Sequence, residues 1–488
     1  MPYYLQVLFN VPKGLKLPPG PPRRFLVGNL KDLPRHKEWE TYDQWRKNFG
    51  DLVYLNIFGK SLLFLNSPKL VSEVFDTRGA IYSERFQSTM LSDLGGFNWS
   101  LALMQPNEIW RQHRSILQKH LSKISMVQHQ VTLGKCSKTL LALLYREPLG
   151  FLKHTRHLIG AMVLESTYGL SIKTENDPYI EVGEKALELF ADISTPGAYL
   201  VDIFPFMKYV PAWFPGAAFK QKASELNFYF TTMKNTPFAA VKAALKAGNA
   251  SPSFVSNLLE IENFEKDSFS QNRETGEELI KSISGVIYLA GIDTVEATIQ
   301  VFFIAMILYP DVQKAAQEEL EKVVGLNSLP TFKDRPNLPY INALCKEVLR
   351  WHPITPAGFP HMLKQDDVIG KYFVPKGTLV MGNTWSLLHS EEVYGSDVHV
   401  FNPARFLKEG IKDPDIAFGY GRRSVELITG ADEAIPMSYH SENACSHSSS
   451  GAINQLRSLK TGVLIFNVKA AQYLDVKDYD NHKHLFVH

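Results

Sequence analysis

Residues 282–310 form the longest stretch of almost entirely apolar side chains in the sequence. As one α-helix this stretch would be roughly 40 Å long, at about 1.5 Å per residue, which is enough to cross a whole domain. Asp293, Glu296 and Gln300 interrupt it near the middle, and such polar groups are costly in the hydrocarbon of a membrane. The sequence therefore predicts a long helix in the core of a folded protein rather than a transmembrane span.

The centre of this predicted helix reads Ala290-Gly291-Ile292-Asp293-Thr294. A glycine inside a helix costs about 1 kcal/mol relative to alanine, so it calls for a reason such as the close approach of a flat ligand. An acid beside a hydroxyl can pass protons into an apolar cavity. Ordinary helix packing explains the same residues, and this segment taken alone favours packing.

A buried helix of this length needs a large core around it. The chain has 488 residues, of which 45% are hydrophobic and 21% charged, and this excludes disordered, collagen-like and disulfide-scaffold proteins. A chain of this size can enclose a ligand cavity, and its net charge of +2 excludes a strong field for nucleic acid. Cys136, Cys345 and Cys445 lie far apart and match no zinc spacing, which suits a reducing compartment.

The pattern along the chain is largely helical with small β pieces. Residues 36–49 have helical spacing and end at a glycine, whereas residues 52–66 alternate in the manner of a hairpin that turns at Gly59-Lys60. Residues 100–325 are mostly helical in pattern, and residues 372–384 return to strand. We therefore expect a mainly α protein with small sheets.

Both ends differ from this central part. Residues 1–14 are apolar for only about ten residues, which is too short to span a bilayer, so the chain is expected to be soluble or to be the later part of a longer anchored chain. Residues 18–22 read Pro-Pro-Gly-Pro-Pro and predict a stiff extended spacer. Residues 424–488 contain a serine-rich stretch and five of the fifteen histidines, without a long amphipathic period.

Two helical segments place charged groups on one face. Glu347 and Arg350 lie three residues apart; a surface pair of this kind contributes little, whereas a buried pair needs a further partner, for which Arg405 is a candidate. Trp110 and Arg114 lie four apart and could together hold a carboxylate, although a solvated basic face is the alternative.

A glycine-spaced segment, residues 418–423, reads Phe-Gly-Tyr-Gly-Arg-Arg. It matches no phosphate-binding loop, because no Gly-Lys-Ser/Thr sequence follows it. Its glycines allow the backbone to approach something flat.

In order and spacing, these segments together resemble the cytochrome P450 family of haem-thiolate monooxygenases, in particular its fungal members, from residue 17 to residue 423. The resemblance implies the mainly α cytochrome P450 fold with small β sheets. It also implies three parts: an N-terminal segment and proline-rich hinge at 1–22, one large haem and monooxygenase domain at 23–423, and a divergent tail at 424–488.

The resemblance also assigns roles to individual residues. Asp293 and Thr294 would relay protons as the catalytic pair, and Glu347, Arg350 and Arg405 would form a structural triad. Trp110 and Arg114 would hold one haem propionate, and His361 the other. The remaining expected haem contacts are Ala290, Gly291, Phe418, Gly421 and Arg423.

The implied activity is oxidation of an apolar organic substrate, with one atom of O2 entering the product. Haem b would be the cofactor, and electrons would come from NADPH through a flavoprotein reductase that docks on basic groups. The resemblance implies the cytosolic face of the endoplasmic reticulum membrane, whereas the chain as it stands is expected to be cytoplasmic, without a nucleic-acid partner. Residues 86–98 and 195–213 are the expected substrate-contacting regions. The candidate docking residues are Arg111, Lys119, Lys123 and Arg422.

The chain departs from the family directly after Arg423, where Val425 and Leu427 replace the cysteine and the glycine of the family pattern. Where the family carries Arg-x-Cys-x-Gly, this chain has Arg423 followed by Ser424-Val425-Glu426-Leu427, so Val425 stands at the expected position of the axial cysteine. Valine has no lone pair, and the thiolate is what favours O–O bond cleavage. The sequence therefore supplies no metal ligand there, and the abrupt end of the match suggests a changed reading frame or splice boundary.

The departure leaves alternatives to the monooxygenase open. The protein could be a catalytically inactive, haem-poor product, or its iron could be ligated from the tail by Cys445 folding back or by an imidazole. The tail histidines are His440, His447, His482, His484 and His488.

Overall fold

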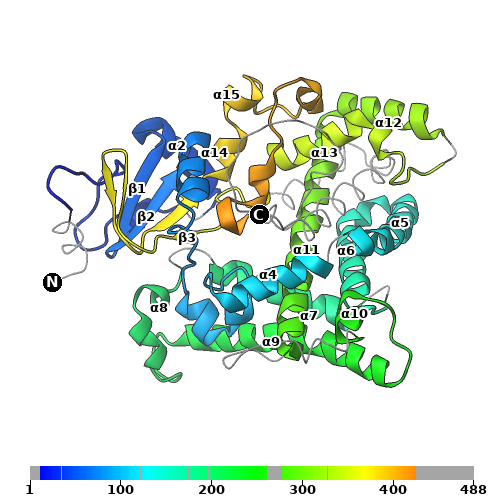
Figure 1. Cartoon of the computed structure of the whole chain (residues 1–488), viewed down its shortest axis with the longest axis horizontal. Helices are drawn as coiled ribbons and strands as arrows, with labels where there is room; N and C mark the ends of the chain where they lie inside the picture. The colour runs from blue at the N-terminus through cyan, green and yellow to red at the C-terminus, as the bar shows by residue number, and fades with distance from the viewer. Residues whose placement is uncertain are drawn as a thin grey trace.

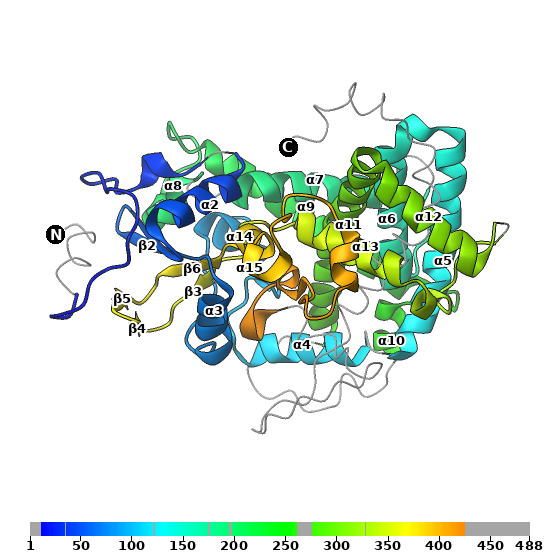
Figure 2. The ribbon, with the colours of Figure 1, turned by 90° about the horizontal axis from the view of Figure 1, so that it is seen from above.

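The computed structural model describes residues 11–34, 36–120, 123–173, 176–194, 198–260, 276–326 and 328–424, and within these ranges the side chains of 118–120 and 123–129 are left aside. A small β part with helix α2 (Glu38–Phe49) lies at one end of the molecule, and a larger helical part forms the other (Figures 1 and 2). The predicted mainly α fold with small sheets is confirmed.

Helix α11 (Gly276–Leu308) passes through the helical part and confirms the long helix predicted from the sequence (Figure 1). It packs most extensively against α6 (Phe151–Tyr168), and both helices contribute many residues to the main hydrophobic core. Among the described residues it is the one helix long and apolar enough to cross a membrane, yet 67% of its most apolar window is buried in the protein.

The sheet confirms the predicted hairpin and extends it. β1 (Leu52–Ile57) pairs antiparallel with β2 (Lys60–Leu65), which pairs parallel with β6 (Leu379–Gly382); β3 (His361–Met362) completes the order β1-β2-β6-β3. β4 (Asp367–Ile369) and β5 (Tyr372–Val374) form a separate pair. The predicted strand region 372–384 is thus divided between two sheets, because the turn after β5 redirects the chain.

The proline-rich stretch lies against this sheet. The N–H of Tyr54 in β1 donates to the carbonyl of Pro19 at 2.8 Å. A Cβ at Gly20 would lie 2.0 Å from the carbonyl oxygen of Tyr54, so only glycine permits this approach. Within the described residues, the predicted spacer is therefore packed along the first strand.

The other helices surround α11 and the sheet. They are α3 (Pro68–Val71), α4 (Glu108–His120), α5 (Lys123–Arg146), α7 (Pro178–Ser194), α8 (Leu200–Ile203), α9 (Ala218–Lys246), α10 (Phe254–Glu260), α12 (Pro310–Val324), α13 (Pro339–Trp351), α14 (Thr384–Leu388) and α15 (Glu391–Tyr394).

Glu347, Arg350 and Arg405 meet in the interior, where α13 packs against the 3-10 helix Pro403–Leu407. Arg350 forms two hydrogen bonds to the Glu347 carboxylate, at 2.7 and 2.9 Å, and Arg405 Nε lies 3.2 Å from the same group. The side chains of Glu347 and Arg350 are fully buried. Two guanidinium groups on one carboxylate, with further bonds to backbone carbonyls, are the additional partners that a buried pair requires.

Candidate functional site

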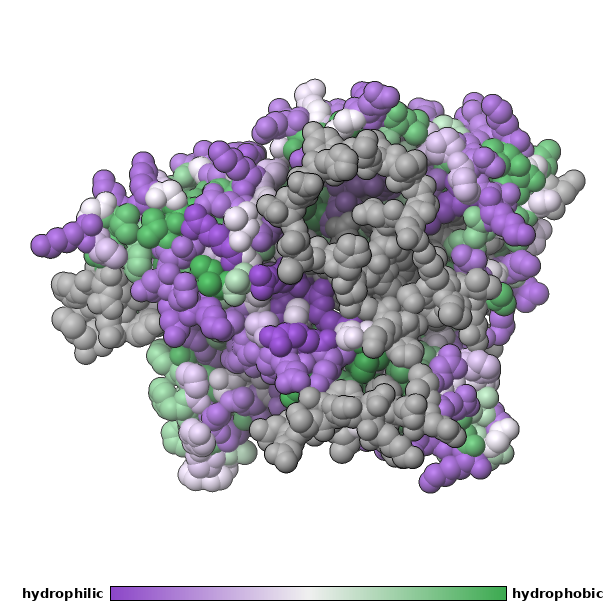
Figure 3. All heavy atoms as spheres, viewed as in Figure 1, coloured by the Kyte–Doolittle hydropathy of each residue, from purple (hydrophilic) through white to green (hydrophobic). Residues whose placement is uncertain are grey.

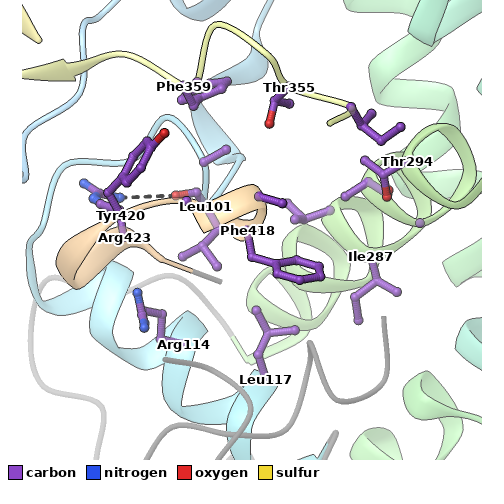
Figure 4. Close-up of a pocket in the computed structure, with 18 of the residues that line it drawn as sticks. Leu101, Arg114, Leu117, Ile287, Thr294, Thr355, Phe359, Phe418, Tyr420 and Arg423 are labelled. Atoms are coloured by element: carbon purple, nitrogen blue, oxygen red, sulfur yellow. Dashed lines mark hydrogen bonds between the residues drawn. The ribbon is translucent and has the colours of Figure 1, made fainter. Parts of the chain in front are cut away.

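A cavity of about 370 Å³ lies between α11, α4 and the segment 417–423 (Figure 4). Its wall is mostly apolar and includes Leu117, Ile287 and Phe359. A cavity of this size and character is typical of a small-molecule or cofactor site. Its position beneath the long central helix brings together segments that are far apart in the sequence.

Basic side chains are concentrated at one side of this cavity. Arg85, Arg114, Arg423 and His361 line it, and the described lining includes no aspartate or glutamate. The hydrogen bonds of the three guanidinium groups go to backbone carbonyl oxygens. Buried positive charge without a carboxylate partner favours an anionic ligand.

Arg85 belongs to this group although the sequence analysis did not select it. Its Nη1 donates to the carbonyls of Phe359 and Pro360, at 3.0 and 2.6 Å, whereas the buried Nε has no hydrogen-bond partner. Burial, followed by the charge of Arg423, holds the pKa of Arg85 well below its usual value. An anion placed beside Arg85 would accept a hydrogen bond from Nε and would raise the pKa of the guanidinium toward its usual value.

The Trp110 ring contacts two of these cations. The guanidinium carbons of Arg114 and Arg423 are 4.8 and 4.5 Å from the Trp110 ring centroid. Arg423 is fixed further by hydrogen bonds from Nε to the Ser83 carbonyl, at 2.9 Å, and from Nη2 to the Met104 carbonyl, at 2.6 Å. Burial lowers the pKa of Arg114 and of Arg423 to about 10, so both stay cationic near neutral pH.

His361 is buried at the start of β3. Its Nδ1 lies 2.8 Å from the Tyr82 carbonyl oxygen, which accepts the proton, so in the neutral ring Nε2 carries the lone pair. Burial and the neighbouring Arg85 hold the pKa of His361 well below its usual value. The imidazole is therefore neutral near pH 7 unless a ligand brings negative charge.

Helix α11 presents Ala290, Gly291 and Thr294 to the cavity. A Cβ at Gly291 would lie 3.0 Å from Val163 Cγ2 of α6, so helix packing supplies a second reason for the glycine. The hydroxyl of Thr294 donates to the Ala290 carbonyl at 2.8 Å, which leaves its oxygen lone pairs available as acceptors.

Asp293 is placed differently from its neighbour Thr294, because it is not among the residues that line the cavity. Burial raises its pKa and the charge of Arg156 on α6 opposes that rise. One turn further along, buried Glu296 accepts a bifurcated hydrogen bond from the Nε–H of Arg156, with Nε 2.9 and 3.1 Å from its two carboxylate oxygens. The structure thus groups Asp293 with an ion pair that the sequence analysis did not identify.

The segment 418–423 packs against the backbone at Phe75 through one residue and lines the cavity through others. Gly421 has φ +53°, and a Cβ there would lie 2.2 Å from the Phe75 carbonyl oxygen, so contact with the neighbouring backbone requires this glycine. Phe418 lines the cavity, and its ring points toward α11 (Figure 4).

The residues present fit the porphyrin of a haem group in two respects. The unpartnered Nε of Arg85 and the cations beside it suit two carboxylates, and the remaining wall suits an apolar ring. The described residues supply no thiolate to the iron, since Cys136 and Cys345 are buried and neither lines the cavity. Val425, Cys445 and the tail histidines lie outside the described residues.

The predicted substrate regions do not form the described wall of this cavity. No residue of 86–98, or of 198–213 within the second region, lines it. The two regions contact each other instead: the Asp202 carboxylate accepts hydrogen bonds from the Ser88 hydroxyl and the Met90 N–H, both at 2.9 Å. Their contact with substrate therefore stays a prediction.

Fold and cavity together describe a site suited to an apolar ligand that carries anionic groups, with the long central helix as part of its wall. The chain belongs to the cytochrome P450 family: the family model "Cytochrome P450" matches residues 18–424. The resemblance inferred from the sequence over residues 17–423 is thereby confirmed. As a member of this family the chain is an enzyme of the monooxygenase class, and the family implies haem as its cofactor.

Curated relatives are fungal enzymes of the same family. Cytochrome P450 monooxygenase ARMGADRAFT_974139 of Armillaria gallica is 39% identical over 429 residues, which are 86% of this chain and 83% of that protein. Cytochrome P450 monooxygenase ple1 of Rhodocybe pseudopiperita is 40% identical, over 83% of this chain and 78% of that protein. Cytochrome P450 monooxygenase 98 of Postia placenta is also 40% identical, over 84% and 79%.

Proposed function

We propose that this protein is a haem-dependent monooxygenase that inserts one atom of O2 into a small apolar organic substrate, with electrons from NADPH delivered by a flavoprotein reductase. The observation that carries the proposal is the cavity itself, in which buried cations face an apolar wall and a threonine of the central helix. Haem b, when bound, supplies the redox chemistry that activates O2.

The residues of the chain would have separate tasks at this site. Arg85, Arg114, Arg423, Trp110 and His361 would bind and orient the two carboxylates of the cofactor. Ala290, Gly291 and Phe418 would enclose the ring and exclude water, whereas Gly421, which was also expected to contact haem, does not line the cavity.

The catalytic proton pathway would use α11. Thr294 would orient a proton donor in the cavity with its hydroxyl. Asp293 would supply protons from the side of the helix that faces Arg156, since burial raises its pKa toward the range in which it holds one.

A matched pair of variants tests the role of Thr294. The hydroxyls of Thr294 and Thr298 both donate to the carbonyl four residues earlier on α11, but only Thr294 lines the cavity. With haem, NADPH and a fungal reductase, T294V is expected to lower product formed per NADPH consumed by about tenfold or more, whereas T298V leaves this ratio unchanged. Incorporation of one 18O atom from 18O2 is the measurement. A wild-type protein that retains haem but gives no labelled product with any apolar substrate contradicts the proposal.

Reductase docking is proposed on the surface beside α4. Hydrophilic side chains gather on the face in Figure 3 around the position of this helix in Figure 1. Arg111 of α4 and Arg422 are both exposed. Arg114 donates to the carbonyl of Arg422 at 2.6 Å, which ties the two segments together. The side chains of Lys119 and Lys123, the other candidates, lie outside the described residues. An acidic partner surface would be steered to this position.

Within the same turnover assay, the double variant R111E/R422E tests the docking surface. At low salt it should slow electron delivery about tenfold or more. K314E, on α12, is the control for a general charge effect. An unchanged reduction rate in the double variant counts against this docking surface.

Contact with a membrane surface is proposed for the segment that joins α8 to α9. Phe206, Tyr209 and Trp213 are 68%, 78% and 82% exposed, and Phe214 is 51% exposed beside them. A gathering of exposed aromatic side chains marks an interaction surface, and Trp and Tyr suit the membrane interface. This supports contact with a membrane surface; the cytosolic face of the endoplasmic reticulum is the location that the family resemblance implies.

Flotation with phosphatidylcholine vesicles tests this attachment. The variant F206S/W213S is expected to reduce the vesicle-bound fraction at least threefold, because it removes two of the four exposed aromatic side chains of this segment. Y145S changes a side chain that is 70% exposed on α5 and serves as the matched control. Equal binding of both variants would exclude this segment as the contact.

A second candidate function is favoured by one observation, the valine at position 425. A family member without the axial cysteine would be a haem-poor or histidine-ligated protein rather than a monooxygenase.

A further inference from the structure

The described polar groups of the cavity are suited to binding an anionic ligand rather than a metal. The described lining contributes three guanidinium groups and one imidazole, and it includes no acidic side chain and no cysteine. Each guanidinium is held by backbone carbonyl oxygens, so none is neutralised by a carboxylate within the described chain. These groups would therefore attract the carboxylates of a tetrapyrrole placed in the cavity.

The rest of the lining acts on the ring of the ligand. Phe418, Ile287 and Val286 are among the apolar side chains of the wall, and Thr294 is its polar group on α11. Burial of a large apolar ring contributes in proportion to the apolar surface removed from water, whether or not the ring carries a metal. Charge-assisted hydrogen bonds to carboxylates are stronger than hydrogen bonds between neutral groups, again without a metal.

From these contacts we propose that the protein is a metal-independent tetrapyrrole-binding protein, which takes metal-free protoporphyrin as readily as haem. The inference rests on the proposed function only in placing the cofactor in this same cavity. The inference goes beyond that function in one respect. The affinity of the protein for the tetrapyrrole would come from the contacts with the carboxylates and the ring, and the iron would add little. Val425, at the position where the family supplies a thiolate, is consistent with this division.

The decisive experiment titrates the haem-free full chain with three probes: haem, metal-free protoporphyrin IX and the dimethyl ester of protoporphyrin. Porphyrin absorbance and fluorescence report binding without any enzymatic turnover. Haem and the metal-free porphyrin are expected to bind within about threefold of each other. The dimethyl ester is expected to bind at least about thirtyfold more weakly, because it carries no carboxylate charge.

Variants locate the site independently of the ester. R85M is expected to weaken haem and metal-free porphyrin equally, by about tenfold or more, since it removes the cation with the unpartnered Nε. R146M removes an exposed arginine from α5 and should leave both affinities unchanged. Circular dichroism of R85M separates loss of binding from loss of folding, and the ester comparison needs no variant.

Each other outcome overturns a specific claim. Haem that binds more than about thirtyfold tighter than the metal-free porphyrin means that a residue outside the described chain ligates iron; the inference then fails while the proposed function stands. Equal binding of ester and acid removes the role of the cations. Binding of none of the three probes overturns both the inference and the proposed function.

Discussion

Replacing Glu347 by glutamine is expected to lower the free energy of unfolding by about 3–5 kcal/mol, which is a large part of the stability of an ordinary domain. The substitution keeps the shape of the side chain but removes its charge. It leaves the guanidinium groups of Arg350 and Arg405 buried without the carboxylate that they share, 2.7 and 3.2 Å away. Breaking a buried ion pair from one side is costly because the remaining charge stays desolvated.

Urea unfolding followed by circular dichroism measures this effect. D397N is the matched control, since Asp397 also pairs with Arg405, at 2.9 Å, but its side chain is 43% exposed. Solvent screens that pair, so we expect D397N to cost about 1 kcal/mol or less. If the two variants lose the same stability, burial is not what gives the Glu347 cluster its importance.

The sequence predicted the members of this cluster but not their surroundings. Spacing alone places Glu347 and Arg350 on one helical face, and that pattern is the same for a surface pair and a buried one. Burial depends on the packing of α13 against the 3-10 helix of Arg405, 58 residues away from Glu347. Such a contact between distant segments has no local signal, so the sequence could offer Arg405 only as a candidate.

The difference between local patterns and contacts of distant segments also explains which cavity residues the sequence predicted and which it missed. The length and the polar interruption of α11 are local properties, and the sequence predicted both. Arg85 was missed because it lies in an irregular segment and meets the carbonyl of Pro360, 275 residues further on. Helical periodicity shows which residues share a face with Asp293. It does not show that Arg156 of α6 lies near that face.

A cysteine at position 425 is expected to change the chemical class of the bound haem. Residue 425 follows directly on Arg423 and Ser424, both of which are buried, and Arg423 is among the cavity-lining residues. The family supplies its axial thiolate at this position, and thiolate donation is what favours O–O cleavage. In V425C, most of the reduced, carbon monoxide-bound protein should show a thiolate-type absorption spectrum, whereas the parent chain should show almost none.

V425S is the matched control for this change, because serine differs from cysteine by one atom and is a far weaker iron ligand than a thiolate. It should behave as the parent does in the spectrum while retaining the same haem content, since the buried cations hold the carboxylates in all three proteins. A thiolate-type spectrum already present in the parent would contradict the prediction and identify Cys445 as the candidate ligand. C445S would then abolish that spectrum. If V425C and V425S both keep the spectrum of the parent, position 425 does not reach the iron in this chain, and the departure from the family extends beyond a single side chain.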